Sequence, residues 1–325
     1  MTMGDPLANT AFHIPVLVDK VLDFLLTDRA GIYVDGTIGG GGHSEAILNR
    51  LVEEGRLIGI DRDRDAVAFC KKRFSSYGEK MHIAYGDLST LDFLLENLGI
   101  KQIDGLFLDL GISSHQIGTS ERGFSYIEEG PLDMRMDVSV SICAKDIVNT
   151  YSEQSLTEIF WTYGEERFAR RIARKIGEER RKRPIETTGA LSEIVQSVTP
   201  YRQRVKTLAR IWQAIRFEVN DELGQLKKGL ESIYPLLKPE GRIVVLSYES
   251  LMDRLVKRFF RGENPTFSKK EPFQSDSQFH FRVLTRRVVR PTEEEVRENP
   301  RARSARLRAA AKKLGSLEDL SDEKH

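Results

Sequence analysis

Short apolar stretches alternate with stretches of helical periodicity over the first 111 residues. Apolar runs of this length fit strands, and apolar residues recurring every three to four positions fit helices. Such an alternation is typical of a doubly wound, mostly parallel sheet. The expected strands span residues 31–36, 55–63, 80–87 and 103–111, and the expected helices span residues 44–51, 66–74 and 90–99.

The alternation stops after residue 111. Residues 112–217 contain no comparable strand, and helical patterns cover residues 155–183, 187–200 and 209–237 before strand patterns resume at 241–250 and 280–289. We therefore predict an α/β fold in which an all-helical domain is inserted into a Rossmann-like sheet domain. The expected parts are residues 1–111 (sheet domain, first part), 112–217 (helical insertion), 218–290 (sheet domain, second part) and 291–325 (charged tail).

Four consecutive glycines, residues 39–42, follow the first expected strand. Glycine lets the backbone approach a ligand and direct its N–H groups at it. Gly39, Gly41 and Ser44 fit the pattern G-x-G-x-x-small, and Asp61 ends the next strand, where a ribose-binding acid is expected. A dinucleotide and S-adenosylmethionine fit this pattern about equally well, and a tight turn without a ligand is the third interpretation. No P-loop lysine follows the glycines.

Every expected strand of the first half ends at or near an aspartate: Asp35, Asp61, Asp87 and Asp109. Ligands of open α/β sheets bind at the carboxyl ends of the strands. Four carboxylates would repel a pyrophosphate, whereas they suit the ammonium and sulfonium groups of S-adenosylmethionine. The alternative is that some of these acids cap helices, Asp87 above all.

The charge balance leaves nucleic-acid binding to local patches, because 50 Lys and Arg stand against 49 Asp and Glu. Basic stretches occur at residues 165–183, 201–206 and 301–308. In the first, Phe168, Ile172 and Ile176 form one apolar helix face and arginines cover the rest. We expect the insertion to contact phosphates, while the C-terminal arginines either do the same or fold back on their domain.

The two cysteines, Cys70 and Cys143, give neither a disulfide framework nor a zinc site of the usual spacing, which fits a cytoplasmic protein without a metal. The early apolar run, residues 14–26, is interrupted by charges and predicts an amphipathic helix, so we expect no membrane span.

Several longer motifs carry a resemblance to a known family. They are "DGTIGGGGHS" (35–44), "DLGISSHQ" (109–116), "GPLDMRMD" (130–137), "YGEERFARRIARKI" (163–176) and "ENPRARSARLRAA" (298–310). In these motifs the chain resembles the bacterial small-subunit ribosomal RNA cytosine-N4 methyltransferases, the MraW family. The resemblance implies a class I methyltransferase fold, S-adenosylmethionine as methyl donor, and a cytosine near the decoding centre as acceptor. The implied partner is small-subunit ribosomal RNA or the small ribosomal subunit.

Carried over position by position, the family's donor contacts fall on Gly41, Gly42, His43, Asp61, Leu88, Asp109 and Gln116. The strand-end acids Asp35 and Asp87 join them as candidates. Leu88 departs from the family, which more often has phenylalanine, so weaker stacking on the adenine is expected. Glu249 and Met252 replace a histidine and a glutamate. These departures leave a non-catalytic RNA-binding relative as one alternative, and an NAD-dependent oxidoreductase is another.

The amine of cytosine is a poor nucleophile, and a hydrogen-bond acceptor beside it would stabilise the charge that develops on its nitrogen. We expect Asp109 near the methyl group and Ser113 or Ser114 near the base, with Asp133 and Asp137 as rivals. The serines could instead cap a helix. Because the target base must be unpaired or flipped out, a stacking wall is also expected. Candidates for that wall, or for the core, are Phe124, Tyr126, Trp161 and Tyr163.

Overall fold

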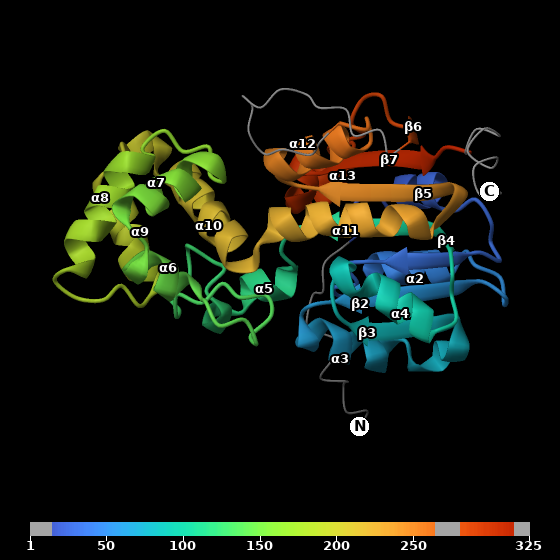
Figure 1. Cartoon of the computed structure of the whole chain (residues 1–325). Coiled ribbons are helices and arrows are strands. Elements are labelled where there is room, and N and C mark those ends of the chain that lie inside the picture. The colour runs from blue at the N-terminus through green and yellow to red at the C-terminus, as the bar shows by residue number, and fades with distance from the viewer. Residues whose placement is uncertain (1–14, 264–279, 315–325) are drawn as a thin grey trace, which may run out of the picture. The chain divides into compact units, whose positions relative to one another are not determined.

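The computed structural model describes residues 15–263 and 280–314, except for the side chains of residues 114 and 115. The chain forms two compact units (Figure 1). Unit 1 comprises Met1–Gly111 and Gln225–His325, and unit 2 comprises Ile112–Gly224. The second boundary lies beyond the expected residue 217, because α10 (Arg204–Asn220) continues to Asn220 and stops only at Asp221, which has a left-handed φ of 44°.

Unit 1 is built on a seven-stranded sheet with the order β3-β2-β1-β4-β5-β7-β6. The first five strands along the chain are parallel to one another, whereas β7 is antiparallel to both β5 and β6. The predicted Rossmann-like sheet is confirmed. The strands are β1 (Ile32–Asp35), β2 (Arg56–Asp61), β3 (Met81–Tyr85), β4 (Ile103–Leu110), β5 (Leu237–Ser247), β6 (Phe281–Val283) and β7 (Arg306–Lys312).

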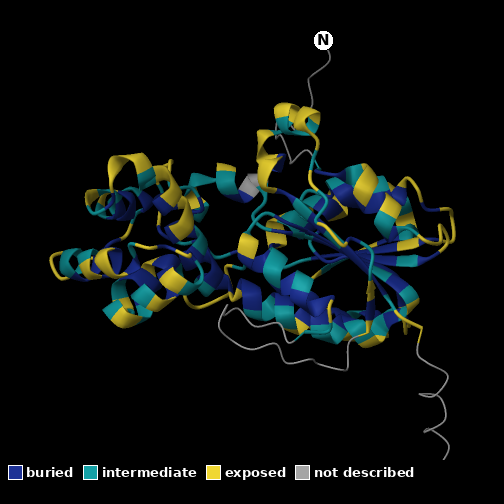
Figure 2. Cartoon of the chain, turned by 90° about the horizontal axis from the view of Figure 1, so that it is seen from above, coloured by how far each residue is buried: buried dark blue, intermediate teal, exposed yellow. Residues whose placement is uncertain are grey.

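Helices cover both faces of this sheet. Successive side chains of a strand point to opposite faces, so Tyr33, Phe107 and Val244 enter one core together with residues of the first three helices. Figure 1 shows α11 running alongside the strands on the other face. The central strands β1, β2 and β4 are mostly buried (Figure 2). The helices of unit 1 are α1 (Val18–Leu25), α2 (Gly42–Leu48), α3 (Arg64–Arg73), α4 (Leu91–Asn97), α11 (Glu222–Leu236, entering from unit 2), α12 (Ser250–Phe259) and α13 (Glu293–Glu298), with 3-10 turns η1 (Ser75–Lys80), η2 (Leu88–Thr90) and η5 (Pro300–Ser304).

The expectation of a charged tail after residue 291 is wrong for residues 306–312, which form strand β7 inside the sheet. The basic residues there are used within unit 1. Arg308 donates to both carboxylate oxygens of Asp253, at 2.6 and 3.0 Å, and Arg306 donates to the Tyr248 carbonyl at 2.9 Å. The alternative that the C-terminal arginines fold back on their own domain is therefore confirmed for Arg306 and Arg308, whereas Arg301 and Arg303 are exposed.

Unit 2 is helical, and no named strand occurs in its described residues. The apolar face expected around residues 168–176 is confirmed, since Ile172, Ala173 and Ile176 are buried in its core. The expected helix at 155–183 is two helices, because the chain between them includes Glu165 with a φ of 47°. The elements are α5 (Ser114–Gly118), α6 (Ala144–Thr150), α7 (Glu153–Thr162), α8 (Ala169–Arg180), α9 (Thr188–Ser197) and α10, with η3 (Ser120–Arg122) and η4 (Tyr201–Gln203).

Among the residues described in both units, we find no helix with the length and apolar character needed to cross a membrane.

Candidate functional site

The glycine loop follows β1 and is hydrogen-bonded to β2 and β4 on either side of it. The Gly36 N–H donates to the Phe107 carbonyl (2.9 Å), and the Ile38 N–H donates to the Ile60 carbonyl (3.0 Å). The Gly39 N–H donates to Oδ2 of Asp61 at 2.9 Å. These bonds join the loop to β4 and β2, so its position is set by the carboxyl edge of the sheet, where ligands of such sheets bind.

Gly41 meets two constraints at once. Its φ of 80° is a left-handed conformation that costs little only for glycine. A Cβ at this position would also lie 2.5 Å from a ring carbon of Phe74. Gly42 is less constrained, since its Cβ would meet the Pro15 ring at 3.2 Å. The first N–H groups of α2, which starts at Gly42, have no partner inside the helix and are available to an acceptor.

Two residues of α3, Arg73 and Cys70, donate hydrogen bonds to backbone carbonyls of the glycine loop. Arg73 donates from Nη1 to the Gly40 carbonyl (2.7 Å) and from Nη2 to Oε2 of Glu45 (2.9 Å). The Cys70 thiol donates to the Gly39 carbonyl at 3.2 Å. Burial raises the pKa of Cys70 to about 12, so the group stays a thiol. Sequence reasoning missed Arg73, because nothing in the spacing links the end of α3 to the loop.

Asp35 is buried beneath the loop. Its carboxylate accepts hydrogen bonds from the Ser44 hydroxyl (2.6 Å) and the Thr37 N–H (3.1 Å). Burial raises its pKa to about 6, although these hydrogen bonds and the nearby His43 oppose the shift. The side chain therefore joins the two ends of the loop, and it is almost completely shielded from solvent.

Asp109 lies at the end of β4 beside His43. The Asp109 N–H donates to the Thr37 hydroxyl at 2.6 Å. Oδ2 of Asp109 lies 3.5 Å from Nδ1 of His43, and Nε2 of His43 lies 2.9 Å from the Val16 carbonyl. A carbonyl oxygen only accepts, so Nε2 carries the proton. Burial lowers the pKa of His43 and favours the neutral ring, which leaves the Nδ1 lone pair facing Asp109.

Tyr248, just after β5, is a third neighbour of Asp109. Burial and the adjacent Asp109 carboxylate both raise the pKa of Tyr248, which keeps its phenol protonated. Its ring also covers Gly111, where a Cβ would lie 3.4 Å from Cδ2 of the tyrosine. Sequence analysis missed this residue, because its relation to Asp109 arises only when β5 pairs with β4.

The remaining strand-end acids differ in their partners. Asp61 accepts the N–H groups of Gly39 and Asp63, both at 2.9 Å, and burial raises its pKa. Asp87 caps η2 and accepts from the Ser89 N–H (2.8 Å) and hydroxyl (2.6 Å), so the helix-cap alternative is confirmed for this residue. Leu88 is buried against Gly229 of α11 and packs over Gly36.

In unit 2, Ser113 and Gln116 cap α5 reciprocally. The Ser113 hydroxyl accepts the Gln116 N–H (3.1 Å), and Oε1 of Gln116 accepts the Ser113 N–H (3.0 Å). The alternative that a serine caps a helix is thus confirmed for Ser113, whose hydroxyl proton is still available for donation. The side chain of Ser114 lies outside the described residues.

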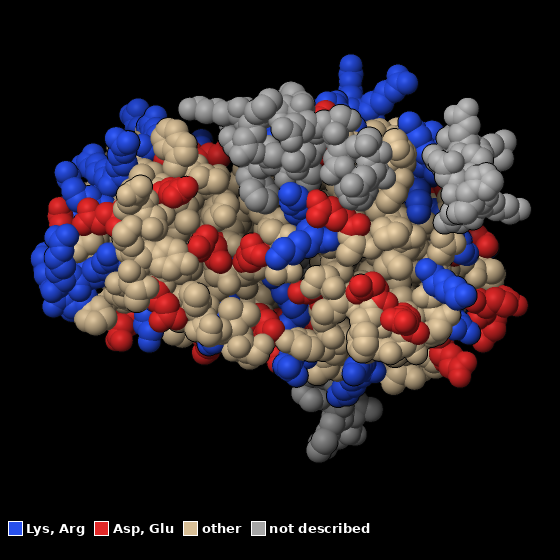
Figure 3. All heavy atoms as spheres, in the orientation of Figure 1, with Lys and Arg blue, Asp and Glu red and all other residues tan. Residues whose placement is uncertain are grey.

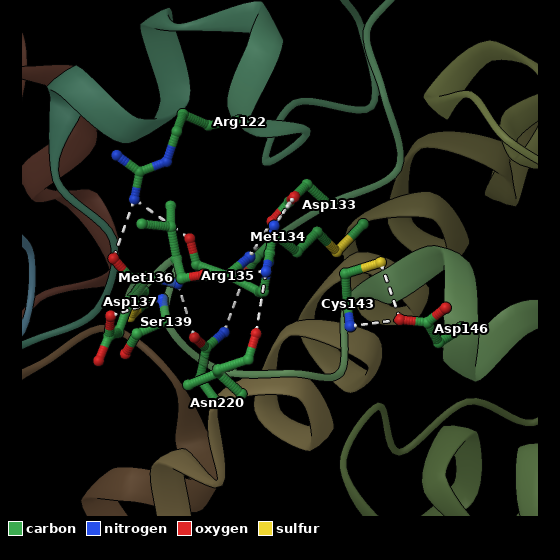
Figure 4. A network of polar contacts seen from close by, with 12 residues as sticks. Arg122, Asp133, Met134, Arg135, Met136, Asp137, Ser139, Cys143, Asp146 and Asn220 are labelled. Atoms are coloured by element: carbon green, nitrogen blue, oxygen red, sulfur yellow. Dashed lines mark hydrogen bonds and ion pairs between the residues drawn. The ribbon is translucent and has the colours of Figure 1, made fainter.

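The rival acids lie in a loop of unit 2 that Asn220 organises (Figure 4). Buried Asn220 accepts from the Met136 N–H (2.8 Å) and donates to the Met134 carbonyl (2.8 Å) and the Arg216 carbonyl (2.9 Å). Asp133 receives two bonds from the Arg135 guanidinium, at 2.9 and 2.8 Å. Burial opposes the effect, but these bonds lower the pKa of Asp133, which is thereby committed to shaping the loop. Asp137 accepts the Ser139 N–H at 2.9 Å.

The four aromatic candidates for a stacking wall separate into core and surface. Phe124 is buried, Tyr126 packs on Trp212 with 6.0 Å between ring centroids, and Tyr163 packs on Phe217 at 6.2 Å. Trp161 is 65% exposed at the end of α7. Of these candidates, it is the one that presents its ring to solvent.

The C-terminal departures from the family pattern fall in α12 and at the residue before it. Met252 is buried in the apolar face of this helix, where a thioether packs without the desolvation cost of a carboxylate. Glu249 is the residue before the first turn of α12. The substitution at Met252 is thus a change in the core of unit 1.

Comparison with known proteins assigns the family. The model of the MraW methylase family matches residues 10–313. The protein is 45% identical over 306 residues to "Ribosomal RNA small subunit methyltransferase H" of Geotalea uraniireducens, covering 92% of this chain and 98% of the relative. Proteins of the same name from Geobacter sulfurreducens (45% over 309 residues, 93% and 99% covered) and Clostridioides difficile (40% over 306 residues, 92% and 98% covered) are similarly close.

These matches cover both units, so the resemblance seen in the motifs is confirmed and the oxidoreductase alternative is wrong. S-adenosylmethionine is accordingly the cofactor. The chain belongs to the MraW methylase family.

Proposed function

We propose that this methyltransferase transfers a methyl group from S-adenosylmethionine to the N4 amine of a cytosine in small-subunit ribosomal RNA, near the decoding centre. The observation that carries the proposal is the match, over 98% of the relative's length, to a protein named as a small-subunit ribosomal RNA methyltransferase. The N4 position and the decoding region follow from the family resemblance. The substrate is the RNA or the small subunit, and the protein acts in the cytoplasm.

The carboxyl edge of unit 1 suits the donor in shape and charge. The bend at Gly41 brings backbone rather than side chains to the edge of the sheet. Each carboxylate oxygen of Asp61 accepts one backbone N–H and keeps a second lone pair, as the two ribose hydroxyls require. Leu88 offers an apolar side chain for the adenine. Asp87 is assigned no direct contact, because its carboxylate caps η2.

Asp109 is the candidate for the chemical step. S-adenosylmethionine supplies a methyl group on a sulfonium, which is ready for displacement. The Asp109 backbone is anchored by Thr37, and its carboxylate is flanked by His43 and Tyr248. A carboxylate held in a fixed position stabilises positive charge that lies or develops beside it, and the protein does not have to reorganise during the reaction. The methylated amine can then lose its proton to water, so no general base is needed.

Ser113 remains the candidate for contacting the base, because its cap role uses the oxygen as acceptor and leaves the O–H to donate. Gly42, His43 and Gln116 are retained as donor contacts through the loop and the α5 turn. For His43 the contact would be made by the backbone, since the ring nitrogens face Val16 and Asp109.

Unit 2 supplies the positive surface that RNA needs. Arg170, Arg171 and Arg174 of α8 are exposed. Figure 3 shows Lys and Arg gathered over the helices of this unit, at the left of the view. Attraction of phosphates to such a surface provides most of the sequence-independent affinity for nucleic acid.

The test is mass spectrometry of small-subunit RNA from a strain that lacks the gene. The expected result is the absence of one N4-methylcytidine, restored by the wild-type gene and by Asp92→Asn, an exposed control on α4, but not by Asp109→Asn. The purified Asp109→Asn protein should remain folded. If the modification is present without the gene, or returns fully with Asp109→Asn, the proposal or the assignment of Asp109 is wrong. A wild-type protein that binds the subunit but adds no methyl group would be a non-catalytic relative.

A further inference from the structure

The first half of α10, with the η4 turn before it, carries two parallel rows of exposed side chains. Residues four apart lie above one another on a helix, so every fourth residue continues a row. The apolar row is Tyr201, Val205 and Ala209, and the basic row beside it is Arg202, Lys206 and Arg210. All six residues are exposed, with Tyr201 at 82% and Val205 at 68%.

The chain just after Trp161 contacts α10 at the far end of these rows. Nε2 of Gln213 donates to the Tyr163 carbonyl at 2.8 Å. In the same segment, Glu166 lies 3.5 Å from Nη1 of Arg210. Tyr201 is thus exposed at one end of the rows, and Trp161, 65% exposed, precedes the segment that packs at the other end.

The charged residues of the two rows on α10 and η4 are all basic. The sequence contains no acidic residue between Glu193 and Glu218. In the described part of the chain, Arg210 is paired with Glu166, whereas Arg202 and Lys206 have no acidic partner. The Arg204 guanidinium lies 5.4 Å from the centroid of the Tyr201 ring and steadies that ring at the surface. Two cations are therefore free to meet an external anion beside an exposed aromatic ring.

We propose that the two rows bind an unpaired segment of the RNA substrate, with bases stacked on Tyr201 and Trp161 and phosphates along the basic row. Aromatic rings interleaved with cations are the usual means of holding single strands without reading their sequence. A protein partner is disfavoured, because lysine and other charges are depleted at the centre of protein interfaces. The inference rests on the proposed function for its substrate class, and goes beyond it by assigning the binding surface.

The test measures binding of the full-length protein to a fluorescein-labelled 12-nucleotide single-stranded RNA of mixed sequence, and to the same sequence as a duplex. Tyr201→Ala should weaken single-strand binding about tenfold, as expected for the loss of one stacked base. Tyr201→Phe should stay within about twofold of wild type, because the ring is kept. Phe93→Ala, which removes an aromatic ring 67% exposed on α4, is the matched control and should change nothing.

The basic row is tested by salt dependence. Lys206→Gln should reduce the slope of log affinity against log salt by about 0.7, the value for one phosphate of a single strand. Lys101→Gln, an exposed lysine of unit 1, should leave the slope unchanged. If Tyr201→Ala and Lys206→Gln both behave like their controls, the inference is wrong. A loss of binding to ribosomal proteins without a loss of RNA binding would identify a protein-docking face and also overturn it.

The two proposals can fail separately. If the RNA-binding results hold but the strain lacks no N4-methylcytidine, the surface stands and the reaction assignment fails. If the modification depends on Asp109 but is unaffected by Tyr201→Ala, and RNA binding is unaffected too, the reaction assignment stands and this surface fails. Thermal unfolding of each variant confirms that any loss of binding does not come from unfolding.

Discussion

Nδ1 of His43 lies 3.5 Å from Oδ2 of Asp109, while Nε2 of the same ring lies 2.9 Å from the Val16 carbonyl. The imidazole is therefore hydrogen-bonded to the chain before α1, and its Nδ1 lone pair faces the carboxylate at the end of β4. The ring is also packed on Phe107, with 4.7 Å between ring centroids. The position of the Asp109 carboxylate thus depends on a residue of the glycine loop, and its effect on donor binding can be measured.

Replacing His43 by phenylalanine should keep the ring packing and remove the hydrogen bond to Val16 and the ring nitrogen that faces Asp109. We expect the dissociation constant for S-adenosylmethionine to rise about tenfold, or about 1.4 kcal/mol. The free energy of unfolding should fall by about 1–3 kcal/mol, because the Val16 carbonyl loses its donor. Calorimetric titration and urea unfolding measure the two effects. His82→Phe, at an exposed position of β3, serves as control. Unchanged donor affinity in His43→Phe would contradict the role given to this ring.

Asp35 should make the unliganded protein less stable as the pH rises. Its pKa is raised by burial to about 6 from a usual value of 3.8. The folded state therefore holds the proton more tightly than the unfolded state, and this stabilisation is complete below pH 4 and lost as the pH passes about 6. At about 1.4 kcal/mol per pKa unit the loss is about 3 kcal/mol. Asp35→Asn cannot titrate, so wild type should lose stability relative to it between pH 4 and 7.

Urea unfolding at several pH values checks this sign, with Asp92→Asn as an exposed carboxylate that should follow the wild-type profile. Parallel profiles for wild type and Asp35→Asn would show that the buried carboxyl does not titrate with a raised pKa.

Gly41→Ala should disrupt the loop. The left-handed φ of 80° costs an alanine about 1–2 kcal/mol, and the added Cβ would meet Phe74 at 2.5 Å. We expect donor binding to weaken by more than tenfold and the melting temperature to fall. Gly118→Ala adds the same methyl group where no atom lies within 4 Å and should leave both quantities near wild type. A Gly41→Ala protein with normal donor affinity would show that the loop adapts.

Asn220→Leu should destabilise unit 2. The change removes the acceptor of the Met136 N–H and the donor to the Met134 carbonyl, and leaves these two backbone groups without that partner. We expect a loss of about 3 kcal/mol in the free energy of unfolding and faster amide exchange in residues 130–140. Asn97→Leu, exposed on α4, is the control and should stay within about 0.5 kcal/mol of wild type. Unaltered exchange in the loop would remove Asn220 from its proposed structural role.

The parts of the fold that sequence predicts are those set by local periodicity. The four strands of the first half are apolar runs, and the buried face of α8 repeats every four residues, so both can be read directly. Strand β7 could not be predicted in this way. Its sequence contains two arginines and a lysine, and its partners lie elsewhere in the chain: Arg308 donates to Asp253 of α12, and the strand pairs with both β5 and β6.

The candidate site shows the same division. The sequence pattern shows the glycines and the strand-end aspartates, but it does not show which aspartate carboxylate is bonded within the loop and which lies beside it. Asp35 and Asp109 both end central parallel strands, yet Ser44 and Thr37 engage the first inside the loop while His43 and Tyr248 flank the second. Thr37, Arg73 and Tyr248 make contacts with residues far along the chain, and only the folded chain reveals them.

The rate at which the Cys70 thiol is alkylated should report on opening of the glycine loop. The thiol lies buried beneath the glycines, bonded to the Gly39 carbonyl, with a pKa near 12. An alkylating reagent can reach it only when that part of the chain opens, whereas Cys143 is partly exposed and supplies an internal reference. The ratio of the two labelling rates therefore reports how often the loop region opens. A bound donor that closes the loop should slow labelling of Cys70 and leave labelling of Cys143 unchanged.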